Sequence, residues 1–446
     1  MRLTTAARLQ PPRGRLVLCT PTPTAPPRAV LDAPPSFNQV NHATARRDSG
    51  GWLCLTLELP EHVDRSALPT ALLGLLSRHE ALRTMVDLTD GTPTTIDFGA
   101  EFSCTLSESD LPDDAAERRT RLMAVIDTAT HSLTGPTICC AAIEGRDRTQ
   151  IVLAVDHGVT DAVSMPLLGR DFVQLYGAAS GGTDRDRTTA HLPAVGSFLD
   201  ACRAEAADTT DPDDPRVAEW HEFFRRNSGG LPRFPLPEDA RHGRGEAAVE
   251  IRHTLTAAQA AAVEQWGRAH DARLPACLLT VCARAAHRQD LCDEFATLLP
   301  VGTRDRAEWR EAVGWFVSNG PVVVPGHLPL EDAVAAAQQQ VERARHLAAM
   351  RLSDVIASYP PGFTHTGDVG MVSFVDYRRV PGHELHDALR MTQASPDAPT
   401  TDVQLWWVRD DSGLALRCRL PDTGAARRIV GRWLDEVEGS LRQLAD

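Results

Sequence analysis

The sequence predicts an α/β protein made of two domains. Its 446 residues exceed what one simple core needs and suit two domains of ordinary size. The short, mostly β-branched apolar run at 150–155 is typical of a buried strand, and apolar residues at helical spacing in 163–176 indicate a helix. Residues 177–190 are small, polar and aperiodic, which favours a linker. The predicted domains are therefore 1–176 and 191–446.

Other elements follow from the same kinds of pattern. Alternation over 52–59 predicts a strand. Ser66 precedes a run of leucines at helical spacing, so we expect it to cap a helix that ends within 78–84. Thr256 begins a capping box, and the last helix, from Gly424, carries one apolar face that should pack on a sheet.

Composition excludes several classes of function. A net charge of −14 argues against nucleic acid and anionic membranes as partners. All 46 basic residues are arginine, so no lysine is present for a Schiff base or a phosphate-binding loop. The 10 cysteines are scattered without zinc spacing, so we expect reduced, mostly buried thiols and no metal. No apolar run approaches membrane-spanning length, and we expect a cytoplasmic protein.

His157 is the candidate catalytic residue. It stands where the strand at 150–155 ends and the chain turns toward the next helix, so its imidazole can face a cleft and titrate near neutral pH. Such a side chain can take a proton from a nucleophile. Asp161, four residues later, could hold the local geometry or tune the ring. The alternative for a lone histidine beside a turn is an ordinary surface residue.

The segment Asp156-His157-Gly158-Val159-Thr160-Asp161-Ala162 resembles the H-H-x-x-x-D-G motif of the condensation domains of nonribosomal peptide synthetases. Asp156 stands at the place of the first histidine, and Ala162 at the place of the glycine. The resemblance implies that His157, the second histidine, acts in catalysis. It leaves open whether the ring is a base or a hydrogen-bond acceptor that aims the nucleophile.

Further segments resemble the same family in the family's order. Residues 78–84 resemble its R-H-x-x-L-R-T block, and residues 36–39 its S-x-x-Q opening. Residues 313–321 resemble its I/V-G-x-F-V-N block with one extra residue, and residues 372–377 its F-N-Y strand. The resemblance also implies that Arg304 pairs with the motif aspartate.

The resemblance implies two chloramphenicol acetyltransferase-like subdomains in a V with a central tunnel. It implies a free-standing, trans-acting enzyme that moves an acyl or aminoacyl group from a phosphopantetheine thioester to an amine or hydroxyl, as in nonribosomal peptide and antibiotic biosynthesis. No cofactor is expected to stay bound. The donor would arrive on an acyl or peptidyl carrier protein or on coenzyme A. The alternative is a catalytically idle condensation-like domain that recruits partner proteins; a serine hydrolase is disfavoured because no G-x-S-x-G elbow is present.

The resemblance assigns the remaining site residues. Asp161, Arg304 and Asp156 are expected to be structural at the active site. The residues expected to contact substrate are Gly158, Ser164, Trp315, Ser318, Asn319 and Asp376. Asp376 replaces an asparagine on a strand that lines the acceptor side in relatives, so we expect it to attract a cationic amine.

Overall fold

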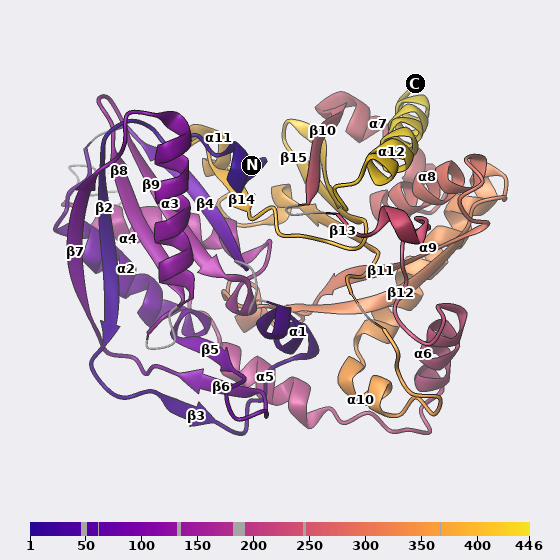
Figure 1. Cartoon of the computed structure of the whole chain (residues 1–446), viewed down its shortest axis with the longest axis horizontal. Helices are drawn as coiled ribbons and strands as arrows, with labels where there is room; N and C mark the ends of the chain where they lie inside the picture. The colour runs from indigo at the N-terminus through magenta and orange to yellow at the C-terminus, as the bar shows by residue number, and fades with distance from the viewer. Residues whose placement is uncertain (46–50, 61, 132–134, 182–191, 244–246, 366) are drawn as a thin grey trace. The chain divides into compact units, whose positions relative to one another are not determined.

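A computed structural model describes the chain apart from residues 46–50, 61, 132–134, 182–191, 244–246 and 366. The chain forms two compact units (Figure 1). Unit 1 consists of Met1–Ala207, Arg304–Phe316 and Arg379–Pro396. Unit 2 consists of Asp208–Thr303, Val317–Arg378 and Asp397–Asp446. Unit 1 therefore includes two short segments from late in the sequence.

The main sheet of unit 1 has seven strands in the order β1-β14-β4-β9-β8-β2-β7. β1 is parallel to β14, and the other neighbours are antiparallel. The bounds are β1 Arg2–Thr5, β14 Thr392–Ser395, β4 Trp52–Leu59, β9 Thr149–Asp156, β8 Ile138–Glu144, β2 Arg15–Pro23 and β7 Phe102–Asp110. A smaller antiparallel sheet has the order β3-β6-β5, with β3 Arg28–Val30, β6 Thr94–Asp97 and β5 Thr84–Asp87.

Helices cover both faces of this main sheet (Figure 1). Successive side chains of a strand point to opposite faces. On β4, Cys54 shares a buried cluster with Ile126 of α3, whereas Leu55 lies against Gly169 of α4. The helices of unit 1 are α1 Phe37–Ala45, α2 Ala67–Arg78, α3 Ala115–Thr130, α4 Ser164–Ala179, α5 Phe198–Ala207 and α11 Leu385–Ala388.

Unit 2 contains a six-stranded mixed sheet in the order β10-β16-β15-β13-β11-β12. β13 is parallel to both β11 and β15. The strands are β10 Ala248–Thr256, β16 Gly413–Leu420, β15 Gln404–Asp410, β13 Met371–Asp376, β11 Glu294–Gly302 and β12 Val317–Pro325. The helices are α6 Pro215–Arg226, α7 Ala257–Ala269, α8 Leu274–Arg288, α9 Leu330–Ala348, α10 Leu352–Ala357 and α12 Gly424–Ala445.

The core of unit 2 forms where α7, α8, α9 and α12 pack on one face of the sheet. Leu416 and Cys418, two residues apart on β16, both enter this core, as strand alternation requires. Trp433 of α12 is fully buried, and its Nε1–H donates to the carbonyl of Cys282 at 3.0 Å. The predicted apolar face of the last helix is thus confirmed, as is the capping box of Thr256 with Gln259.

Two local predictions differ from the structure. Ser66 precedes α2 as expected, but its side chain does not cap the helix. Oδ1 of Asp64 accepts instead from the backbone amide of Ser66 at 2.9 Å. α2 ends at Arg78, and residues 80–83 form a separate 3-10 turn, so the helix is shorter than the leucine spacing indicates.

The division of the chain also differs from the expected one. α4 continues to Ala179, three residues into the predicted linker, and positions 182–190 of that linker lie outside the described residues. The late segment Arg379–Pro396 belongs to unit 1 because its strand β14 lies between β1 and β4 in the sheet of that unit. Pairing between strands so distant in sequence leaves no local signal at a boundary.

We expect Gly320→Ala to lower the free energy of unfolding by about 1–3 kcal/mol, because overpacking forces the backbone to shift. A Cβ atom at Gly320 on β12 would lie only 2.1 Å from the carbonyl oxygen of Ala344 on α9. Gly431→Ala is the matched control: a Cβ at Gly431 in α12 meets nothing within 4 Å, so it should stabilise by about 0.5–1 kcal/mol. Urea denaturation measures both, and equal effects would contradict the packing argument.

Candidate active site

The predicted catalytic histidine lies in a short 3-10 turn, His157–Val159, directly after β9. Hydrogen bonds from the amides of His157 and Gly158 hold the turn in place. The amide of His157 donates to the carbonyl of Gly51 at 2.7 Å. Oδ1 of Asp156 accepts from the amide of Gly158 at 2.9 Å and so caps the turn. Asp156 is buried, at 4% exposure, which fits its predicted structural role.

The hydrogen bonds of His157 define its tautomer. Nδ1 lies 3.0 Å from the carbonyl oxygen of Thr160. A carbonyl oxygen can only accept, so Nδ1 carries the proton and Nε2 of the neutral ring keeps its lone pair. The indole of Trp315 stacks on the imidazole, with ring centroids 4.2 Å apart and planes inclined by 28°. The ring is therefore held in one orientation with a basic nitrogen available.

Burial and a second histidine keep this ring neutral. Burial penalises the charged imidazolium, and the nearby ring of His42 disfavours a second positive charge, so the pKa of His157 is lowered to about 4. Asp156 favours the imidazolium and so raises the pKa of His157, but its effect is smaller than those of burial and His42. At neutral pH the ring can accept a proton, and the resulting imidazolium is a strong acid that returns the proton readily.

Asp161 and Arg304 form the ion pair that the resemblance implies. Nη1 of Arg304 lies 2.7 Å from Oδ2 of Asp161, and Nη2 lies 3.0 Å from Oδ1, so the contact is bidentate. The amide of Phe316 donates to the same carboxylate at 3.0 Å, and the guanidinium lies over the Phe316 ring. Burial alone would raise the pKa of Asp161, but Arg304 and the hydrogen bonds from Ser164 lower it below its usual value.

Two residues expected to contact substrate make hydrogen bonds within the protein. The hydroxyl of Ser164 is fully buried; it receives hydrogen bonds from Arg304 at 2.8 Å and from the amide of Gly314 at 3.2 Å. Gly158 is also buried, and its carbonyl accepts from Nε2 of Gln39 at 2.7 Å. Both residues are therefore engaged by contacts within unit 1, and their role toward a substrate remains a prediction.

The other predicted contacts divide between the two units. Trp315 belongs to unit 1 and is half-buried against His157. Ser318 and Asn319 lie on β12 of unit 2, opposite Val301 and Pro300 of β11, and both are half-buried. Their role toward a substrate remains a prediction.

Asp376, which we expect to attract a cationic amine, lies in an ion-pair network of unit 2. Its carboxylate is held by Arg378, with Nε at 2.8 Å from Oδ1 and Nη2 at 2.7 Å from Oδ2. Arg378 also contacts Glu264 at 2.8 Å, and Glu264 in turn binds Arg409 at 2.9 Å. Asp376 is thus part of an alternating ion-pair network whose guanidinium already neutralises it. Its role toward an acceptor remains a prediction.

A buried polar network supports the same region of unit 1. His79 is fully enclosed; its Nε2 donates to Asp171 at 2.9 Å, and its Nδ1 faces the amide of Val313 at 3.4 Å. Arg78 and Arg170 also bind Asp171. Burial lowers the pKa of His79, so the ring stays neutral. Arg78 and His79, the first two residues of the R-H block, thus belong to a largely buried polar network.

Sequence reasoning missed His42. Nε2 of its ring lies 3.3 Å from Oδ2 of Asp156, and the ring centroid lies 5.8 Å from that of His157. One signal was present, because Ser36 and Gln39 form the capping box of α1 and Gln39 reaches Gly158. His42 lies three residues beyond Gln39 on the same helix, hence on the same face.

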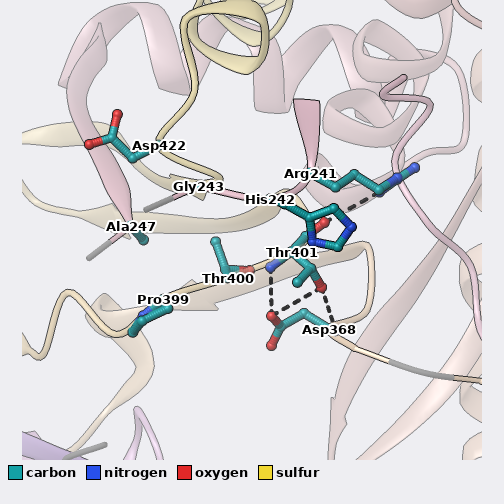
Figure 2. Close-up of a pocket in the computed structure, with 9 residues that line it drawn as sticks. All are labelled: Arg241, His242, Gly243, Ala247, Asp368, Pro399, Thr400, Thr401 and Asp422. Atoms are coloured by element: carbon teal, nitrogen blue, oxygen red, sulfur yellow. Dashed lines mark hydrogen bonds between the residues drawn. The ribbon is translucent and has the colours of Figure 1, made fainter. Parts of the chain in front are cut away.

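The remaining features concern the described residues as a whole. Among them, no group of three or more His, Cys, Asp or Glu side chains could hold a metal ion, and the ten cysteines are free. A cavity of about 170 Å³ lies in unit 2, between Arg241, Asp368, Thr401 and Asp422 (Figure 2). Asp368 is bound there by Thr401, and the cavity contains no predicted site residue. Within the described part of the chain, no helix is long and apolar enough to cross a membrane.

Comparison with known proteins identifies relatives over most of the chain. The sequence model of the Condensation domain family matches residues 48–359. Acyltransferase PapA3 of Mycobacterium tuberculosis is 26% identical over 317 residues, which are 68% of this chain and 65% of that protein. The chain thus spans about two thirds of the length of PapA3. Trehalose-2-sulfate acyltransferase PapA2 of the same species is 24% identical over 76% of this chain and 73% of its own length.

Solved structures share the fold. The structure described as PapA2 acyl transferase has a TM-score of 0.89 at 21% identity and covers 100% of both chains. The condensation domain of the Monacolin K polyketide synthase MokA has a TM-score of 0.68 at 17% identity, over 93% of this chain and 97% of that one. The predicted α/β class of condensation-domain type is therefore confirmed.

Breaking the ion pair at the motif should destabilise unit 1. We expect Asp161→Ala to lower the free energy of unfolding by about 3–5 kcal/mol, because Arg304 is then left buried without its carboxylate. The double variant Asp161→Ala/Arg304→Ala should lose less than the sum of the single variants, as measured by urea denaturation. Asp422→Ala, which removes the exposed pair with Arg427, should cost at most about 1 kcal/mol. Additive losses at Asp161 and Arg304 would contradict the pairing.

The lowered pKa of His157 predicts a pH-dependent stability. The folded ring binds a proton only near pH 4, whereas the unfolded ring does so near pH 6.5. Between these values the unfolded state binds more protons, so stability falls as pH falls. From pH 7 to pH 5 the wild type should lose about 1–2 kcal/mol more than His157→Gln, measured by urea denaturation at both pH values. An identical pH dependence in the two proteins would show that the ring is not buried in its neutral form.

Proposed function

The chain belongs to the condensation domain family, and on this premise we propose that it is an acyltransferase acting through His157. One observation carries the proposal: a neutral imidazole whose Nδ1–H is bound to the Thr160 carbonyl, which leaves Nε2 as a base. The proposed donor is an acyl thioester of phosphopantetheine, on a carrier protein or on coenzyme A. No permanently bound cofactor is needed for this transfer.

We propose a hydroxyl compound as acceptor, giving an ester. Two observations support this choice over an amine. Arg378 neutralises Asp376, so the charge that would have favoured a cationic amine is compensated. The relatives include a protein named trehalose-2-sulfate acyltransferase, and a trehalose derivative of this kind carries hydroxyl groups and no amine.

The proposed reaction has two steps. The acceptor oxygen attacks the thioester carbonyl carbon while its proton passes to Nε2 of His157, and the carbonyl electron pair moves to oxygen. The tetrahedral intermediate then collapses, the C–S bond breaks, and the proton passes from Nε2 to the departing sulfur. The products are an ester and a free thiol. Because the pKa of His157 is about 4, the imidazolium is short-lived and protonates the leaving group efficiently.

The residues around His157 serve this chemistry by fixing its geometry. The Thr160 carbonyl and the Trp315 ring define the direction of Nε2. The Asp161–Arg304 pair fixes the backbone immediately after the turn. Such preorganisation lets the base act without reorienting during the reaction. An idle recruiting domain would not need this arrangement, which favours the enzyme over the alternative function.

We expect His157→Ala to lower the rate of acyl transfer about 10²- to 10⁴-fold, because the base is lost. Decanoyl-CoA serves as a probe donor with a panel of sugars and polyols, and product esters are quantified by mass spectrometry. His346→Ala, at an exposed position of α9, is the control and should retain wild-type activity. Circular dichroism checks that both variants fold. Near-full transfer by folded His157→Ala would refute the assignment.

A further inference from the structure

α1 places His42 beside the motif, although His42 and Asp156 are 114 positions apart in the sequence. It lies in the last turn of Phe37–Ala45, and its side chain is 13% exposed. The same helix presents Gln39, whose amide donates to the carbonyl of Gly158. α1 therefore makes two polar contacts with the segment that carries His157.

The bond between His42 and Asp156 has a defined direction. Asp156 is a buried aspartate whose Oδ1 already accepts from the amide of Gly158. Its Oδ2 lies 3.3 Å from Nε2 of His42, and an ionised carboxylate only accepts, so Nε2 carries a proton. The one carboxylate of Asp156 thus joins the capped turn to the His42 ring.

The surroundings of His42 are shaped to its ring. A Cβ atom at Gly51 would lie 2.3 Å from Cε1 of His42, and one at Gly158 would lie 3.3 Å from Cδ2. Both neighbouring positions are glycine, which admits the imidazole at van der Waals distance. The ring also meets the edge of Trp315, at 5.7 Å between centroids and 69° between planes. His42, His157 and Trp315 form a cluster of three rings on unit 1.

We propose that His42, anchored by Asp156, is a positioning residue for His157, and that this pair replaces the first histidine of the H-H-x-x-x-D motif. The sequence has an aspartate where the motif has that histidine, and the structure supplies an imidazole to the aspartate from α1. The contact through which His42 acts is its hydrogen bond to Asp156, because Asp156 also caps the turn that carries His157. This inference rests on the proposed function of His157.

The charged groups around His157 are few among the described residues. His42 disfavours a second positive charge on the ring, and Asp156 favours it. On the far side of the turn, Asp161 is neutralised by Arg304. On β5, which packs against the turn, Asp87 is engaged by Thr89. Replacing His42 with an uncharged ring therefore removes one repulsion and leaves Asp156 unscreened, and both changes raise the proton affinity of His157.

Two substitutions separate the hydrogen bond from the packing. His42→Gln keeps an N–H donor near the position of Nε2, and His42→Phe keeps a ring but loses the donor. We expect His42→Phe to lower kcat about tenfold or more with little change in KM for decanoyl-CoA, and His42→Gln to restore most of kcat. If the ring merely fills space, Phe will be the better substitute and the proposal falls. His346→Phe is the control for the chemical change itself.

A second measurement is independent of activity. NMR titration of ¹⁵N-histidine-labelled protein gives the pKa of His157 in the wild type and in His42→Phe. We expect the pKa to rise by about one unit in the variant, with a matching shift in the acid limb of kcat/KM. An unchanged pKa overturns the positioning role whether or not the probe substrates react. Activity retained by His157→Ala overturns the proposed function instead, so the two failures are distinguishable.

Discussion

The bidentate contact between Arg304 and Asp161 is the constraint on which the rest of unit 1 depends. It joins the turn after β9 to the segment Arg304–Phe316, which lies about 140 residues later in sequence. Desolvating two charges is costly, and the cost is repaid only when the remaining donors and acceptors are satisfied. Here the amide of Phe316 and the hydroxyl of Ser164 complete the shell. Because Trp315 lies next to Phe316, the same contact also fixes the ring that stacks on His157.

The elements with strong local periodicity were predictable from sequence. Residues 52–59 form β4 as expected, and the final helix buries Trp433 as its apolar face requires. The pair of Asp161 with Arg304 was also foreseen, although only from the resemblance to condensation domains. What these cases share is a signal contained in a short stretch or in a recognisable motif.

The contacts that were not foreseen depend on side-chain partners. Asp376 and Ser164 were assigned to substrate from their place in a motif, and in the structure they are also engaged by Arg378 and Arg304, respectively. His42 reaches Asp156 across 114 positions of sequence, and no period or spacing marks such a contact. At the start of α2, the side chain of Asp64 accepts a hydrogen bond where that of Ser66 was expected to, because a carboxylate or a hydroxyl oxygen can satisfy an exposed amide. Side-chain partners chosen by tertiary packing are not encoded locally.

The position of β14 in the sheet of unit 1 has a consequence for how the protein can be made. β14 comprises Thr392–Ser395 and lies between β1 and β4 in the sheet, although β1 and β4 both come from the first 59 residues of the sequence. During synthesis, the main sheet is therefore incomplete until Thr392–Ser395 have left the ribosome, and until then the edge of β4 that pairs with β14 has unpaired amides and carbonyls. Contacts of such long sequence separation also slow folding. A fragment ending at residue 190 would lack both this strand and Arg304, so it would leave one edge of β4 and the carboxylate of Asp161 without these partners.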